Sequence, residues 1–194
     1  MSRATQIRPR WWVTIIWRFV GFTALLRCAE AFGLAALECS TEKMQICTST
    51  NIRASKGDIW PLLTQSRMDV PGCFCLGLPQ PKSCELPSGV GGVGLERRCI
   101  SDRGTVIQRI TEWSPPTKLT FEMVSTDHTW SSCVESLKEE FTLIDSGEIT
   151  HVTRRTTIKS MGFLSLIKEI GFYAGLKRVH LYVFKNWKTT AEIG

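Results

Sequence analysis

The sequence predicts one α+β domain over residues 44–188, in which a curved antiparallel sheet and a long C-terminal helix enclose an apolar cavity. Two observations support this class. The segments after residue 44 alternate apolar and polar residues, as half-buried strands do, and turn residues separate them. Residues 163–187 instead repeat apolar side chains at the helical period. One sheet leaves an apolar face uncovered, so we expect the helix to cover it.

The expected elements begin with a strand at 44–52, where apolar and polar residues alternate. A short helix follows, because Ser55 and Asp58 have the spacing of a capping box. Residues 66–92 contain four of the chain's eight prolines and predict a long loop, with at most a short strand at 73–78. A loop of that length in a compact domain is often functional.

Five further strands are expected, as antiparallel neighbours joined by short turns. The turn residues are Asp102-Arg103-Gly104, Ser114 to Thr117, and Ser146-Gly147. They separate strands at 93–101, 105–113, 118–124, 134–144 and 149–159.

The last of these hairpins gives the sharpest site prediction. If Asp145 faces Glu148 across the turn, Glu139 lies directly opposite Arg154. Phe141 shares their face, which we expect to point into the cavity. Buried charges are costly unless they are paired, so we predict an ion pair whose arginine has spare donors for a ligand carbonyl or carboxylate. The alternative is a structural bridge without a ligand role.

Short motifs along the chain carry a resemblance to a known superfamily. They are Ile59-Trp60-Pro61-Leu62-Leu63, Leu78-Pro79-Gln80-Pro81, Gly94 to Cys99, Gly104 to Trp113, Thr153 to Thr157, and Val179 to Val183 with Asn186-Trp187-Lys188. In their order and spacing, over Met44 to Lys188, they resemble the helix-grip fold of the START-like, polyketide cyclase-like (SRPBCC) superfamily. Gln108 is a departure, because similar proteins often have an acid there that could pair with Arg98.

The resemblance implies a cavity for a lipid, sterol, polyketide or other apolar molecule, and only some members of the superfamily are enzymes. We therefore predict binding or transport of an apolar small molecule, lipid-like or polyketide-like, without a cofactor. One alternative is a cyclase or aromatase in the same cavity, with a cavity acid or His180 moving protons. Another is an interaction module whose own side chains fill the cavity. The candidate ligand-binding residues are Trp60, Arg98, Phe121, Glu139, Phe141, Val152, Arg154, Tyr173, Leu176 and His180.

Net charge argues against a nucleic-acid partner. The formal charge is +6, but five arginines precede the first acid, Glu30, and the rest has 19 basic against 18 acidic residues. A nearly neutral domain lacks the positive surface that binds a phosphate backbone.

The N-terminal segment, 1–43, is basic and hydrophobic. Residues 11–26 are strongly apolar and resemble a membrane anchor, yet Arg18 in their middle opposes a spanning helix. Three interpretations stay open: membrane contact through residues 11–37, a cleaved organellar targeting peptide, or a helix packed on its own domain or on a partner. The expected location is accordingly membrane-associated or cytoplasmic.

The eight cysteines form no C-x-x-C pair, so we expect no zinc or redox site of that type and no metal. Several lie in predicted strands, which favours a reducing compartment. Cys73, Cys75 and Cys84 share one predicted loop, and the spacing leaves open whether they crosslink it.

Overall fold

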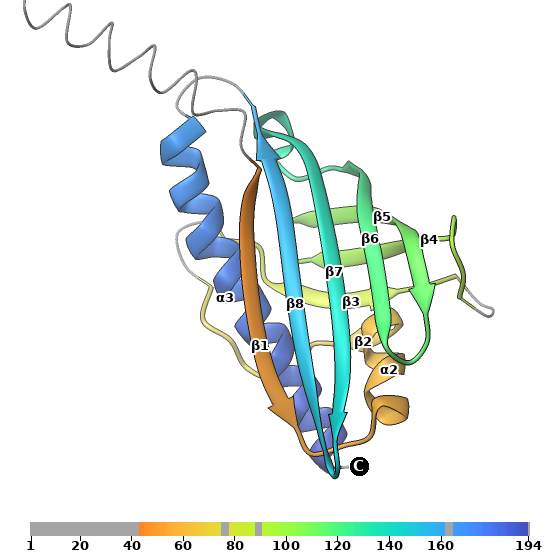
Figure 1. The fold of residues 1–194 in the computed structure, drawn as a ribbon. Helices are drawn as coiled ribbons and strands as arrows, with labels where there is room; N and C mark the ends of the chain where they lie inside the picture. Colours follow the sequence, from red (N-terminus) through yellow and green to blue (C-terminus); the bar gives the residue numbers. More distant parts are fainter. Residues whose placement is uncertain (1–42, 75–77, 88–90, 162–164, 194) are drawn as a thin grey trace, which may run out of the picture. The chain divides into compact units, whose positions relative to one another are not determined.

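A computed structural model describes residues 43–74, 78–87, 91–161 and 165–193 (Figure 1). Within these ranges an eight-stranded antiparallel sheet has the order β1-β8-β7-β6-β5-β4-β3-β2. The elements are β1 (Met44–Ile52), α2 (Lys56–Thr64), β2 (Ser66–Arg67), β3 (Pro81–Glu85), β4 (Glu96–Ser101), β5 (Gly104–Ser114), β6 (Lys118–Thr126), the 3-10 turn η2 (Ser131–Cys133), β7 (Val134–Ser146), β8 (Ile149–Ser160) and α3 (Ser165–Ile193).

The first strand and helix form as predicted. Strand β1 has the predicted bounds, and the hydroxyl of Ser55 accepts the backbone N–H of Asp58 at 3.3 Å. The loop predicted at 66–92 is interrupted by β2 and β3, and Cys73, Phe74 and Leu78, the described residues of 73–78, belong to no strand. Proline is tolerated as the first residue of a strand. Its partner, β4, then provides the pairing along Cys84 and Cys99.

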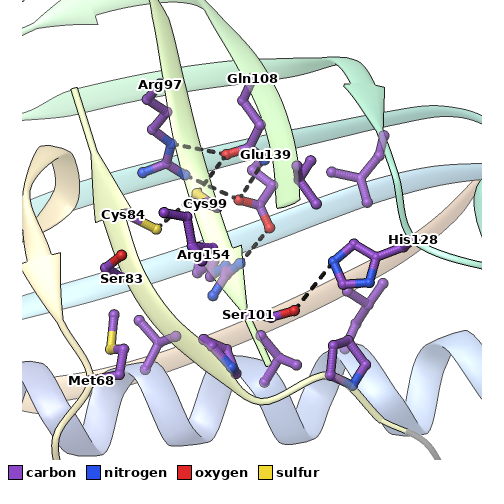
Figure 2. Close-up of a pocket in the computed structure, with 18 of the residues that line it drawn as sticks. Met68, Ser83, Cys84, Arg97, Cys99, Ser101, Gln108, His128, Glu139 and Arg154 are labelled. Atoms are coloured by element: carbon purple, nitrogen blue, oxygen red, sulfur yellow. Dashed lines mark hydrogen bonds and ion pairs between the residues drawn. The ribbon is translucent and has the colours of Figure 1, made fainter. Parts of the chain in front are cut away.

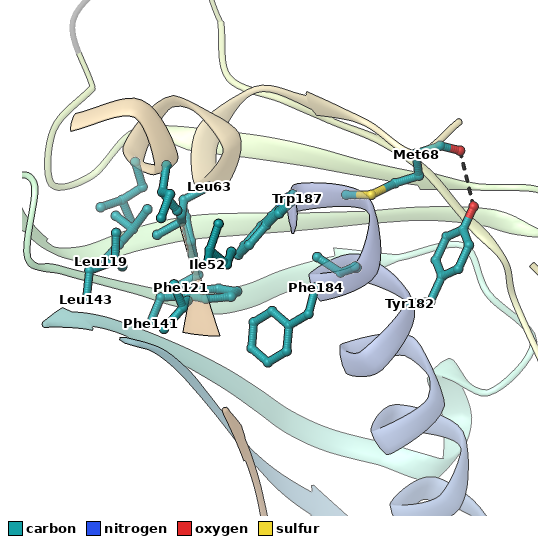
Figure 3. Close-up of a cluster of buried hydrophobic side chains, with 14 residues drawn as sticks. Ile52, Leu63, Met68, Leu119, Phe121, Phe141, Leu143, Tyr182, Phe184 and Trp187 are labelled. Carbon is teal, nitrogen blue, oxygen red and sulfur yellow. Dashed lines mark hydrogen bonds between the residues drawn. The ribbon is translucent and has the colours of Figure 1, made fainter. Parts of the chain in front are cut away.

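Helix α3 runs along the concave side of the sheet, as the sequence predicts (Figure 1). The predicted end of the helix, at residue 187, is too early. The helix continues to Ile193, and the Glu192 carboxylate accepts the backbone N–H of Arg53 at 3.0 Å, which ties its last turn to the end of β1. The side chains that α3 places in the core are Tyr182, Val183, Phe184 and Trp187, and they pack on Ile52, Leu63, Leu119, Phe121, Phe141 and Leu143 (Figure 3).

Helix α3 also holds the segment that leads into β3. The Tyr182 hydroxyl donates to the Val70 carbonyl at 2.9 Å, and the Asn186 side-chain oxygen accepts the Val70 N–H at 2.9 Å. Further along, a Cβ added at Gly175 would lie 2.6 Å from Leu78 Cδ2. Gly175 therefore lets this segment approach the helix closely, as its small size suggests.

The hairpin of β7 and β8 has a different register from the one predicted. Its loop is Gly147-Glu148, with Gly147 at φ 73°, so Ser146 faces Ile149. Glu139 consequently lies opposite Thr156, and Phe141 opposite Arg154. A shift of two residues leaves every side chain on the same face of the sheet. Glu139 and Arg154 therefore share one face as predicted, although the predicted register is wrong.

The hairpin of β4 and β5 decides which arginine enters the cavity. Its loop has two residues, Asp102-Arg103, and Ser101 pairs with Gly104 at φ 152°. Arg97 therefore lies opposite Gln108 and is buried, whereas Arg98 is exposed. Arg98, which was predicted to contact the ligand, therefore does not line the cavity; a three-residue loop would be needed to turn it inward.

Candidate functional site

A cavity of about 130 Å³ lies between the sheet and α3 (Figure 2). It separates two apolar clusters, the main core around Phe141 and Trp187 and a smaller cluster around Leu137 and Leu176. Members of both clusters line it. The lining side chains able to do chemistry are Cys84, Arg97, Cys99, Gln108, His128, Glu139, Arg154 and Trp187.

Glu139 is the centre of a buried polar cluster. It is 4% exposed, and its carboxylate accepts a very short hydrogen bond from Arg154 Nη2 and longer ones from Arg97 at 3.4 Å and Gln108 at 3.2 Å. Burial alone would raise the pKa of Glu139, but the guanidinium groups of Arg154 and Arg97 outweigh it and lower the pKa to about 2. The predicted ion pair of Glu139 with Arg154 therefore forms, with Glu139 ionised.

Arg97 is the member of this cluster that sequence reasoning missed. Its Nε donates to Gln108 Oε1 at 2.9 Å, and its Nη1 donates to the Leu63 carbonyl at 2.5 Å. Its Cζ lies 3.4 Å from the centroid of the Phe121 ring, a cation–π contact that offsets part of the desolvation of the charge. Gln108 thus stands between Arg97 and Glu139, and Glu139, from β7, supplies the acid that β5 lacks.

The cluster has more positive than negative charge, and some of its N–H donors have no acceptor. Two guanidinium groups face one carboxylate, so one positive charge is in excess. Two lining residues also keep buried N–H groups without a hydrogen-bond partner, Arg154 Nε and Trp187 Nε1. Both residues lie beside the Phe141 ring, at 5.2 Å for Arg154 Cζ and 5.6 Å for the Trp187 ring. Such groups are uncommon in native interiors.

His180 is fully buried but does not line the cavity. Its Nδ1 and Nε2 each lie 2.8 Å from a threonine hydroxyl, of Thr48 and Thr156 respectively. Thr156 also donates to Glu139 at 3.4 Å, so we assign the ring proton to Nε2, which donates to Thr156. Burial lowers the pKa of His180 to about 3, with the Arg154 charge acting in the same direction. His180 is therefore neutral, and it contacts the polar cluster through Thr156, which bonds to Glu139.

The other predicted residues divide between the cavity and its surroundings. Phe141 and Leu176 line the cavity with Glu139 and Arg154. Phe121 and Val152 are fully buried in the core, and Trp60 packs against that core, edge-on to Trp113. Tyr173 is 45% exposed on α3, one position beyond the inward Phe172, so the structure does not bring it to the site.

His128 lines the cavity, although no sequence pattern around it indicates a site. It is 5% exposed, stacks on Trp130 with centroids 5.2 Å apart, and lies 3.4 Å from the Ser101 hydroxyl (Figure 2). Burial lowers its pKa, against the charges of Asp127 and Asp102. His128 is consequently neutral at pH 7 and adds no charge to the cavity.

Solved structures similar to this one include a START superfamily protein from Mycobacterium smegmatis (9% identity, TM-score 0.55, covering 78% of this chain and 98% of that one). An aromatase/cyclase from Streptomyces matches at 14% identity and TM-score 0.58, over 78% of this chain and 94% of its own. Major latex-like protein 151 of Panax ginseng matches at 13% identity and TM-score 0.57, over 77% and 97%. The chain therefore has the helix-grip fold, and the predicted resemblance to START-like, SRPBCC proteins is confirmed for the fold.

No protein-family model matches the chain, and no curated protein matches it in sequence.

Membrane contact and the absence of a metal stay predictions. In the described ranges no helix is long and apolar enough to cross a membrane, and the segment predicted to contact one, 11–37, lies outside them. Those same ranges hold no group of three or more His, Cys, Asp or Glu side chains placed to bind a metal ion.

Proposed function

We propose that this domain binds an apolar small molecule that carries one acidic group, with the acid held at Arg154. The observation that carries the proposal is the pair of unpartnered N–H groups, Arg154 Nε and Trp187 Nε1, in a cavity wall with one excess positive charge. A carboxylate would accept hydrogen bonds from both and neutralise that charge. The apolar part would lie against Leu137, Leu176 and Val183.

Cavity size supports one of the two ligand classes that the sequence suggests. An apolar cavity of roughly 150 Å³ holds one benzene molecule, whereas whole ligands of drug size occupy about 300 to 1,000 Å³. The cavity of about 130 Å³ therefore suits a single ring or a short chain. A compact, polyketide-like aromatic acid fits this volume better than an extended acyl chain.

A titration with two probes of the same shape tests the proposal. Benzoate and benzamide have nearly the same shape, but benzoate is charged and only accepts hydrogen bonds, whereas benzamide is neutral and has an NH2 donor in place of one oxygen. Backbone amide chemical shifts of the full-length protein report binding of each. Hydrogen bonds to charged groups are about 1 to 1.5 kcal/mol stronger than neutral ones, so we expect benzoate to bind about tenfold more tightly than benzamide. The shifted resonances should belong to cavity residues such as Phe141 and Leu176.

Adjacent arginines supply a matched pair of variants. Arg154→Met removes the inward guanidinium but leaves Arg97 to pair with Glu139. Arg155→Met removes an exposed guanidinium that pairs with Glu140 on the other face. We expect the preference for benzoate to disappear in the first variant and persist in the second. Equal binding of both probes to the unmodified protein would refute the proposal.

A cyclase acting in the same cavity is the alternative function. The fold likeness to an aromatase/cyclase is compatible with it. The two groups predicted to move protons are poorly suited to that role. Glu139 is held ionised by two arginines, and both ring nitrogens of His180 bond to threonine hydroxyls outside the cavity. Turnover of a poly-keto substrate that is lost in His128→Ala would support the alternative, since His128 lines the cavity.

A further inference from the structure

Two cysteines face each other across neighbouring strands in the cavity wall. Cys84 on β3 is directly opposite Cys99 on β4, and their sulfur atoms lie 2.8 Å apart (Figure 2). Both are free thiols, since a disulfide bond is about 2.05 Å long. Directly opposed residues of antiparallel strands have Cα atoms about 4.5 to 5.5 Å apart, within the 4.4 to 6.8 Å range of disulfides. The pair can be bridged without rearranging the sheet.

The surroundings make the two thiols unequal. The hydrogen bond from Cys99 lowers the pKa of Cys84 from 9.0 to about 7 against the effect of burial, and the Arg97 charge acts with it. The same hydrogen bond and burial raise the pKa of Cys99. Cys84 is therefore the thiol of the pair that ionises more readily, and its thiolate is the nucleophile. Both residues are half-buried and line the cavity, which gives a small reactant a route to them.

We propose that Cys84 and Cys99 are a dithiol site that exchanges with small disulfides to form a reversible cross-strand disulfide. The Cys84 thiolate attacks one sulfur of a disulfide RSSR, which forms the mixed disulfide Cys84–S–SR and releases RS⁻. Cys99 then loses its proton and attacks the Cys84 sulfur, which expels the second RS⁻. One RSSR is reduced to two RSH, and the two cysteines are oxidised to one disulfide.

Oxidation would change the site described above. The Cys99 sulfur also lies 3.3 Å from Gln108 Oε1, and Gln108 donates to Glu139. A disulfide removes the S–H of Cys99 beside Gln108 and fastens β3, which has only the two-residue β2 beyond it, to the rest of the sheet. The same bond would stiffen the wall that Pro81 and Ser83 contribute to the cavity. This proposal does not depend on the identity of the ligand.

Peptide mapping of the full-length protein tests the proposal with 2-hydroxyethyl disulfide as the probe. This reactant is small and neutral, so the positive charge of Arg97 neither attracts nor repels it. Trypsin cleaves after Lys82, Arg97, Arg98 and Arg103, which places Cys84 and Cys99 in separate peptides. We expect these two peptides to be recovered joined, with loss of two hydrogen atoms, and to separate on reduction.

Two variants and an internal control distinguish the pair from ordinary reactive thiols. In Cys99→Ala the hydroxyethyl adduct should persist on Cys84, and the pH midpoint of its formation should move above the value near 7 expected for the unmodified protein. Cys84→Ala removes the hydrogen bond that raises the pKa of Cys99 but leaves its burial, so Cys99 should form an adduct only at higher pH than Cys84 does in the unmodified protein. Cys47, exposed on β1, should form a simple adduct in every variant. Separate adducts on Cys84 and Cys99, or no reaction at Cys84 while Cys47 reacts, would overturn the proposal.

Discussion

Replacing Glu139 with glutamine should destabilise the domain by about 3 kcal/mol at pH 7. The carboxylate is 4% exposed and lies between the guanidinium groups of Arg97 and Arg154. A pKa lowered from 4.5 to about 2 corresponds to about 3 kcal/mol of stabilisation by the ionised form. Removing one partner of a buried ion pair typically costs about 3 to 5 kcal/mol. The two magnitudes agree.

The stability lost in Glu139→Gln should depend on pH. A carboxyl group whose pKa is lower in the folded state stabilises the protein above its unfolded pKa, and that stability disappears as the pH falls through the folded value. The difference in unfolding free energy between the unmodified protein and Glu139→Gln should therefore be full above pH 4.5 and vanish towards pH 2. Urea denaturation followed by circular dichroism at a series of pH values measures it.

Glu140→Gln is the matched control, because the neighbouring carboxylate faces the other side of β7 and pairs with Lys118 and Arg155 at the surface. Such surface bridges contribute about 0 to 1 kcal/mol. A loss below 1 kcal/mol for Glu139→Gln at pH 7, or a loss that does not change with pH, would show that the buried carboxylate is not held as we describe.

Two further predictions concern α3. His180→Gln should reduce the fall in stability on acidification below pH 6.5, because the pKa of His180 is lowered to about 3 in the fold and its protonation favours unfolding; urea denaturation at pH 7 and pH 4.5 measures this. Gly171→Ala should stabilise the helix by about 0.5 to 1 kcal/mol, since its added Cβ meets open space. Gly175→Ala should stabilise the protein less than Gly171→Ala, or destabilise it, because its Cβ would displace Leu78. Thermal denaturation of both variants measures the difference.

The sequence predicts this fold well because each strand has one buried face. Apolar residues alternate so regularly from Met44 to Ile52 that the predicted and observed bounds of β1 agree. The capping box at Ser55 and the helical repeat of α3 are equally local signals. Where the signal is absent, as in the proline-rich segment predicted as a loop, β3 was not predicted, since β3 depends on its partner β4 more than on its own pattern.

The site is harder to predict because it depends on register. Arg97 and Arg98 are adjacent, and the residues of β4 include no apolar alternation that would favour one face. The length of the Asp102-Arg103 loop alone decides which arginine is buried. By contrast, Phe141 and Val152 mark the inner faces of β7 and β8, so Glu139 and Arg154 were placed on one face even with the wrong register.

Tyr173 and His180 illustrate a second limit. One residue along a helix corresponds to a rotation of about 100°, which is enough to move Tyr173 from the inner face of α3 to the surface. His180 does face inward, but only the structure shows that two threonine hydroxyls, from β1 and β8, occupy its ring nitrogens. These partners are far apart in the sequence, and no local pattern predicts them.

Native mass spectrometry of the full-length protein with a mixture of benzoate, decanoate and their two amides tests the central claim most directly. If the cavity holds an apolar acid at Arg154, one-to-one complexes should form with the acids in preference to the amides, and with benzoate in preference to decanoate. The preference for the acids should disappear in Arg154→Met, which removes the guanidinium of the site. Complexes with all four compounds in equal amounts, or with none, would contradict the claim.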